Sequence, residues 1–117
     1  MKLTELDAEF IRYERDGIHT YLPKVETLAD AQGIIFLCPK CWQQNNGPRG
    51  THSVICWSSS RGVPDFADPK PGRWRMDGTG IADLTLNSEN PHGGARSIQL
   101  LGGCNWHGFI DNGDAHE

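Results

Sequence analysis

The sequence lacks long apolar runs and long helix-forming stretches. Charged residues recur every few positions over residues 1–17, so this stretch matches neither a secretory signal nor a membrane span. We therefore expect a cytoplasmic protein without a membrane partner. No segment has helical apolar periodicity beyond a turn or two, and no repeat of solenoid length is present. These absences argue against helical bundles and repeat arrays.

Apolar residues and positive charge are also scarce. Hydrophobic residues make up 37% of the 117 positions, whereas 14 glycines and 7 prolines favour short strands joined by turns. A chain of this length supports one modest core, so we expect residues 1–117 to form a single domain. The net charge of −4 gives no general attraction to a polyanion, and nucleic-acid binding is therefore not expected.

Segments with strand character follow one another along the chain. An Asp-Gly pair at residues 16–17 predicts an N-terminal hairpin. Five further apolar runs predict strands at 33–38, 51–58, 72–76, 82–86 and 96–101. Between them, Thr27 can cap and Gly33 can end one short helical turn. The predicted fold class is mainly β, a small antiparallel sheet or sandwich with at most one short helix, in which residues 60–72 form an exposed loop.

The four cysteines are the strongest chemical signal. In a reducing compartment Cys38, Cys41, Cys56 and Cys104 are expected to be metal ligands or buried thiols rather than disulfides. Cys104 and His107 repeat the three-position spacing of the first cysteine pair, and both pairs follow an apolar strand directly. Two such zinc knuckles can bring three thiolates and one imidazole onto a tetrahedral zinc ion. We predict a zinc-ribbon-like site whose ligands are Cys38, Cys41, Cys104 and His107.

Other interpretations of these residues stay open. His52 and Cys56 lie on one face of the strand predicted at 51–58, so either can substitute in the ligand set. The simpler roles are a half-buried histidine and a core thiol. Redox chemistry at Cys38 and Cys41 would require the pair to open a helix in an α/β pattern, and residues 42–50 make a poor helix start. A framework of two disulfides is a further alternative.

Signals for catalysis are weaker than the signal for a metal site. Residues 106–116 can be interpreted as an HNH-like nuclease in which His107 is the general base, Asn112 an orienting amide and His116 a metal ligand. A carboxylate of Asp111 or Asp114 would then lie beside the metal. A β-hairpin at residues 111–114 is the simpler interpretation, because this stretch is a turn signal. We expect a non-catalytic protein, with a small metal-dependent hydrolase or HNH-like nuclease as the alternative.

Two further groups of residues are candidates for binding. Arg61, Lys70, Arg73 and Arg75 form the one basic cluster of the sequence. This cluster predicts a site for an anion or an acidic partner, or else a strand edge protected by charge. The four tryptophans each lie in or beside a predicted strand or knuckle, where covering the core is their expected role.

The order of these motifs resembles a family of small uncharacterised proteins encoded by tailed bacteriophages and prophages. The stretches that carry the resemblance are AQGIIFLCPKC, GTHSVICW, PGRWRMDGTGIADLTL and GGCNWHGFIDNG, from about Ala31 to Gly113. The resemblance implies a zinc-knuckle β domain and a phage accessory role, with a host protein, a phage protein or a small anionic ligand as partner. It implies no established activity. Some members are labelled ammonia monooxygenase, an activity of membrane copper assemblies that the histidines of this chain do not suit.

Overall fold

A computed structural model describes residues 1–70, 72–89, 96–100 and 103–117. The described strands are β1 (Glu9–Ile11), β2 (Glu14–Asp16), β3 (His19–Tyr21), β4 (Lys24–Val25), β5 (Gly33–Leu37), β6 (Ser53–Trp57), β7 (Trp74–Asp77), β8 (Thr85–Ser88), β9 (Ile98–Gln99), β10 (His107–Asp111) and β11 (Asp114–His116). The helical elements are α1 (Pro39–Asn45) and the 3-10 turns η1 (Leu3–Glu5), η2 (Leu28–Asp30), η3 (Ser59–Arg61) and η4 (Ile81–Asp83). The predicted fold class, mainly β with one short helix, is confirmed.

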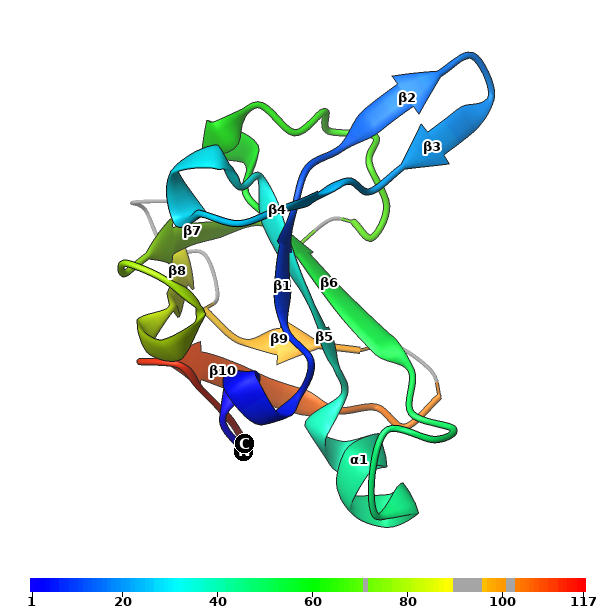
Figure 1. Cartoon of the computed structure of the whole chain (residues 1–117), viewed down its shortest axis with the longest axis vertical. Helices are drawn as coiled ribbons and strands as arrows, with labels where there is room; N and C mark the ends of the chain where they lie inside the picture. The colour runs from blue at the N-terminus through cyan, green and yellow to red at the C-terminus, as the bar shows by residue number, and fades with distance from the viewer. Residues whose placement is uncertain (71, 90–95, 101–102) are drawn as a thin grey trace.

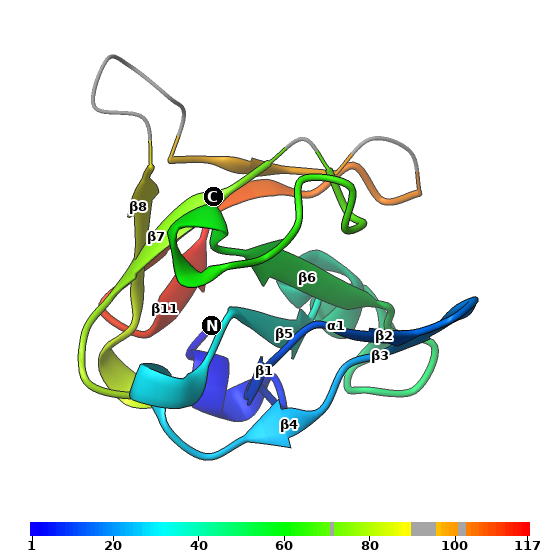
Figure 2. The ribbon, with the colours of Figure 1, turned by 90° about the horizontal axis from the view of Figure 1, so that it is seen from above.

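The strands form small sheets in which every pairing is antiparallel. Strands β4, β1, β5 and β6 make a four-stranded sheet in that order, and β11, β10 and β9 make a three-stranded one (Figure 1). The β2–β3 hairpin projects from the body of the protein, and β7 pairs with β8. Seen from above, β9 and β10 lie on the opposite side of β6 from β1 (Figure 2). In the strand orders given above, β6 and β9 are each the outer strand of their own sheet.

Turn residues account for the two hairpins. The hairpin predicted from Asp16-Gly17 is present, but Asp16 still belongs to β2 and the turn residues are Gly17, with a positive φ of 59°, and Ile18. Asn112 and Gly113 both have positive φ, 47° and 78°, between β10 and β11. Two consecutive positive φ values match the twist of the flanking strands, so this turn closes the hairpin expected at residues 111–114.

Two local features differ from the prediction. Thr27 does cap a 3-10 turn, since its Oγ1 accepts a hydrogen bond from Asp30 N–H at 3.3 Å. Gly33 does not end that turn but opens β5, where a side chain would come within 2.6 Å of Cys56 O. Helix α1 forms in the stretch that we expected to be a poor helix start. Pro39 occupies its first position and Asn46 ends it with a φ of 55°, both favourable at these positions.

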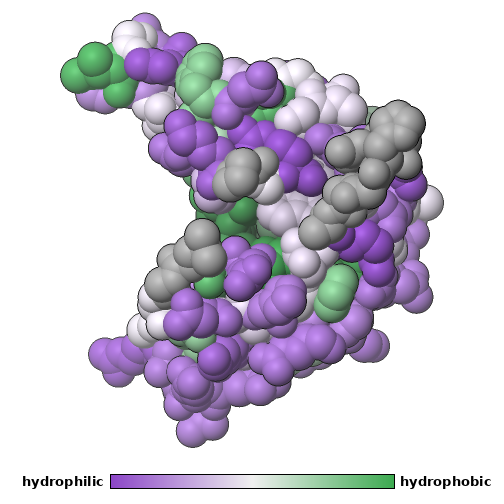
Figure 3. Space-filling view, turned by 180° about the vertical axis from the view of Figure 1, so that it is seen from behind, coloured by the Kyte–Doolittle hydropathy of each residue, from purple (hydrophilic) through white to green (hydrophobic). Residues whose placement is uncertain are grey.

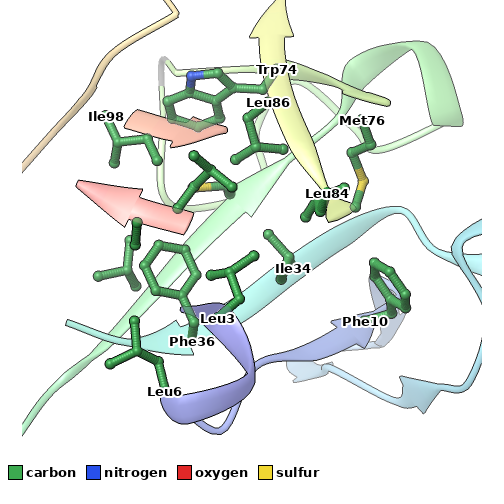
Figure 4. Packing of buried hydrophobic residues seen from close by; sticks show 14 of the residues in the cluster. Leu3, Leu6, Phe10, Ile34, Phe36, Trp74, Met76, Leu84, Leu86 and Ile98 are labelled. Atoms are coloured by element: carbon green, nitrogen blue, oxygen red, sulfur yellow. The ribbon is translucent and has the colours of Figure 1, made fainter. Parts of the chain in front are cut away.

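The main core lies between the sheets and combines residues from most of the chain. Leu3, Ile34, Phe36, Leu84 and Ile110 are among its fully buried members, and Figure 4 shows several of them together. Trp106 packs edge-on against Phe36, with ring centroids 6.1 Å apart. Trp57, Trp74 and Trp106 are buried and Trp42 is partly buried, so the expected core role of the tryptophans is confirmed.

The loop predicted at residues 60–72 is exposed only in part. It begins inside η3, and Val63 and Ala67 are buried in a second apolar cluster with Ile11 and Trp57. Two positions of predicted segments, Pro71 in this loop and Leu101 in the strand at 96–101, lie outside the described residues. Within the described part of the chain, no helix has the length and apolar character required to span a bilayer.

Candidate metal centre

Four side chains from three separate segments converge at one end of β5 and β6. Cys38 follows β5, Cys41 lies in α1, His52 precedes β6, and Cys104 lies before β10. Their ligand atoms all lie within 4.8 Å of one another. Cys38 Sγ is 3.5 Å and His52 Nε2 is 3.3 Å from Cys104 Sγ. A tetrahedral zinc ion with ordinary bond lengths places such atoms about 3.5–3.8 Å apart. The group can therefore hold a metal ion.

The pairing of β5 with β6 places His52 opposite Cys38. The N–H of Cys38 donates a hydrogen bond to His52 O at 2.9 Å, so the two residues are cross-strand neighbours. Directly opposed residues project from the same face of an antiparallel pair, which directs both side chains to the same side. Cys41 follows Cys38 by three positions at the start of α1 and lies on the same side of the turn. The first predicted knuckle thus supplies two ligands.

The geometry of His52 fixes which ring nitrogen is available. Nε2 faces Cys104 Sγ, whereas Nδ1 lies 3.3 Å from Ser53 O. When Nδ1–H donates to this carbonyl, Nε2 carries the free lone pair. Histidine ligands of metals are commonly oriented by such a second hydrogen bond. His52, one of the two alternatives in the sequence prediction, therefore fits the role of the nitrogen ligand.

The second predicted knuckle contributes Cys104 but not His107. His107 is the first residue of β10, where it pairs with Gln99, and its exposed ring lies 6.3 Å from that of Phe109. Because side chains alternate along a strand, the neighbour Trp106 enters the core and His107 points elsewhere. The four-residue group contains His52 in the place that the spacing assigned to His107.

Cys56 is a core thiol rather than part of the group. It pairs with Ile34 inside the sheet and is almost completely buried. It also lies four residues along the strand from His52, about 13 Å at the usual rise of a strand. Burial raises the pKa of its thiol well above the ordinary value, so it stays protonated.

The three thiols of the group differ in acidity. Burial raises the pKa of Cys38 to about 12, and burial also raises the pKa of Cys41. Burial acts in the same direction on Cys104, but without a metal ion the other tautomer of His52 donates Nε2–H to its sulfur, and this bond and the backbone N–H of Trp106 outweigh burial and lower the pKa to about 6. A bound cation would favour the thiolate form of all three. Lys40 Nζ donates to Cys104 O at 2.7 Å and brings a compensating positive charge.

The cysteines are free thiols. None of the four forms a disulfide, and the 3.5 Å between Cys38 Sγ and Cys104 Sγ is far longer than an S–S bond. Cys38 and Cys41 lie where a helix begins directly after a strand. The expected absence of such a helix was our argument against redox chemistry, and that expectation is wrong. That strand belongs to an antiparallel sheet, however, and not to the parallel α/β pattern of thioredoxin-like proteins.

The three arginines of the predicted basic cluster bind other groups of the chain. Arg61 Nη1 donates to Leu28 O and Ala31 O, and Arg75 pairs with Asp77. Arg73 donates to five backbone carbonyls, at 2.8–3.3 Å, from Pro64, Asp65, Ala67, Pro69 and Gly72. Arg61 and Arg73 therefore hold the loop between β6 and β7, whereas Arg75 is paired within β7. The structure does not present them together as a free anion site.

Of the residues of the nuclease alternative, His116 contacts Asp111, the ring of His107 lies beside that of Phe109, and the backbone N–H of Asn112 donates to Thr85 Oγ1. Asp111 has two partners. Its carboxylate accepts from His116 Nε2 at 2.8 Å and from Arg96. These two hydrogen bonds, that of His116 first, lower the pKa of Asp111. The pKa of His116 is raised by the carbonyl of Glu117 and by Asp111. In the described part of the chain, the Cys3His cluster is the one group of three or more His, Cys, Asp and Glu residues placed to share a metal ion.

The chain matches no protein-family model, no curated protein and no solved structure. Its class is therefore defined by its own fold and site. It is a small, mainly β protein with a Cys3His cluster whose geometry suits a metal ion.

Proposed function

We propose that this protein binds one zinc ion through Cys38, Cys41, His52 and Cys104 and acts as a non-catalytic interaction module. The observation that carries the proposal is the convergence of these four ligand atoms within 4.8 Å from three segments. Three thiolates and one imidazole form a donor set typical of structural zinc. Soft sulfur ligands in tetrahedral geometry also disfavour magnesium, calcium and manganese.

A structural role follows from the number of ligands. Four protein ligands fill a tetrahedral shell and leave no position for a reactive water. The nuclease alternative would need an open position, and its residues lie in the β10–β11 hairpin rather than in the cluster. The zinc would instead hold α1 and the starts of β6 and β10 in place, so that their surroundings present a fixed surface.

A protein partner is favoured over a small anion. Arg61 Nη1 and both Nη groups of Arg73 donate to backbone carbonyls, and Arg75 pairs with Asp77. We further propose that the protein is an accessory protein of a tailed phage or prophage and acts in the bacterial cytoplasm. The support for this origin is the sequence resemblance.

Metal analysis of the purified protein tests the proposal. We expect close to one zinc per chain, because one four-ligand site is present. His52→Ala should lose most of this zinc, whereas His107→Ala, a matched change at an exposed histidine three positions from Cys104, should retain it. A folded wild-type preparation with four titratable thiols and no metal would contradict the proposal. Loss of zinc in His107→Ala alone would restore the ligand set predicted from spacing.

A further inference from the structure

A groove of about 780 Å³ lies beside the Cys3His cluster. Residues 52–55 at the start of β6 form part of its lining, and residues 97–100, which include β9, form another part. Lys70 and Trp74 also line it, as does Gly103, the neighbour of Cys104. Figure 3 shows the protein hollowed on this side, with apolar surface inside and hydrophilic residues around it. The volume falls within the range of about 300–1,000 Å³ that is usual for ligand sites.

The edge of β6 that faces away from β5 carries unused main-chain groups. His52 O accepts a hydrogen bond from Cys38 N–H, and Ser58 N–H donates one to Gln32 O. Residues 52 and 58 therefore direct these main-chain groups toward β5 and the residue before it or after it. Because bonding direction alternates along an antiparallel strand, the main-chain groups of Ser53 and Ile55 point away from β5. Ser53 O lies near His52 Nδ1. Among the described residues, Ser53 N–H and both main-chain groups of Ile55 have no partner.

The edge of β9 is arranged in the same way. Leu100 N–H donates to Trp106 O at 2.9 Å, so Leu100 bonds toward β10. The preceding residue, Gln99, therefore directs its main-chain groups away from β10. Strand β9 is an outer strand of its sheet, as β6 is of the other. Two strand edges with available donors and acceptors therefore border one groove. An exposed strand edge is a template for pairing with another chain.

The chemistry of the lining narrows the occupant. Val54, Trp74, Ile98 and Leu100 make the groove apolar. Of the described residues that line it, Lys70 alone carries a full charge, and none is a carboxylate. The groove thus has three features: free strand edges, an apolar lining and one lysine. An extended peptide fits all three, because its backbone can pair with an edge, its alternate side chains can fill the apolar space, and a carboxylate can pair with Lys70. Addition of a strand to a sheet edge is a recurrent mode of peptide recognition.

We infer that the groove binds an extended segment of another protein, which adds as a strand to the outer edge of β6 and places an acidic group near Lys70. This inference rests on the proposed function, since it names the kind of partner that the interaction module takes. The cluster and the groove share His52, and Gly103 adjoins Cys104. A metal ion at the cluster would therefore fix two parts of the groove wall relative to each other.

The test begins with a displayed library of random nonapeptides selected on the zinc-loaded full chain. We expect selection to yield peptides with alternating apolar residues and an acidic residue. A synthetic peptide of the selected sequence should shift the NMR amide signals of Ser53, Ile55 and Gln99. Ser53→Pro removes the outward N–H without touching the bonds to β5, and should weaken binding at least tenfold. Ser53→Ala, which keeps that N–H, should bind within twofold of wild type.

Two further measurements separate the possible failures. If Ser53→Pro does not fold, N-methylation of alternate amides in the peptide tests strand addition from the other side, because it removes the N–H groups that would bond to β6. Unchanged affinity of the methylated peptide would overturn strand addition. Lys70→Ala should weaken binding of the acidic peptide about fivefold and leave its neutral analogue unaffected. A preparation with full zinc that selects no peptide would overturn the groove inference alone. A preparation without zinc would overturn the metal centre, whatever it binds.

Discussion

Removal of the metal should lower the melting temperature by an amount that the chain length allows us to work out. The site joins Cys41 to Cys104 across the 62 residues between them. By the logarithmic loop law, holding the ends of a loop of this length together costs about 3–4 kcal/mol of chain entropy, and a metal that joins them in the folded state must contribute at least this amount. An unfolding entropy of about 2.1 cal/mol/K per residue gives about 0.25 kcal/mol/K for a chain of this size. The expected fall is therefore at least about 12 °C.

Circular dichroism melting curves with and without a strong chelator measure this fall. Metal analysis of the same samples must confirm that the ion has left, and added zinc should restore the original curve. The Cys104→Ser variant is the control, because it lacks a ligand and its melting temperature should not respond to the chelator. A metal-free wild-type protein that melts within 2 °C of the loaded one would refute the idea that the metal joins distant parts of the chain.

Three further changes test other parts of the structure. Arg73→Lys should lower the free energy of unfolding, measured by urea titration, by about 2 kcal/mol, because one ammonium cannot reach the five carbonyls. The control Arg75→Lys changes an exposed ion pair and should cost under about 0.5 kcal/mol. Gly108→Ala should lower the melting temperature by several degrees, because its Cβ would lie 2.4 Å from His116 O. The raised pKa of His116 makes its contribution complete below about pH 6.5 and lost as pH rises through that raised pKa. The melting difference between wild type and His116→Ala should therefore be larger at pH 6 than at pH 9, and an equal difference would rule out the ion pair with Asp111.

Features set by neighbouring residues in the sequence could be predicted. The glycine signals at residues 16–17 and 112–113 predict their hairpins locally, and the burial of Cys56 agrees with the simpler of the two roles weighed for it, a core thiol. The pairing of Cys38 with Cys41 depends on one turn of the chain and was also predicted. Local spacing likewise assigned Cys104 to the site, and the structure brings it to the other two thiols.

The choice between His52 and His107 could not be made from local spacing. It depends on the register of β5 with β6, which sets Cys38 opposite His52. It also depends on the direction of His107, which follows the buried Trp106 and points away from the core. Helix α1 was missed because its polar residues lack an apolar period, and because Pro39 and Asn46 act as start and stop signals outside that period. The partners of Arg73 are backbone carbonyls, which leave no trace in the identity of the loop residues.

The guanidinium of Arg73 gives the loop between β6 and β7 an unusual tolerance of change. Every amino acid carries a carbonyl, so a loop held through carbonyls to one arginine keeps its path when its side chains vary. Asp65, Phe66, Asp68 and Lys70 all project into solvent from this loop. Lys70 also lines the groove. Side chains at these positions can thus change, Lys70 beside the proposed peptide groove among them, while the carbonyl bonds to Arg73 keep the loop in place.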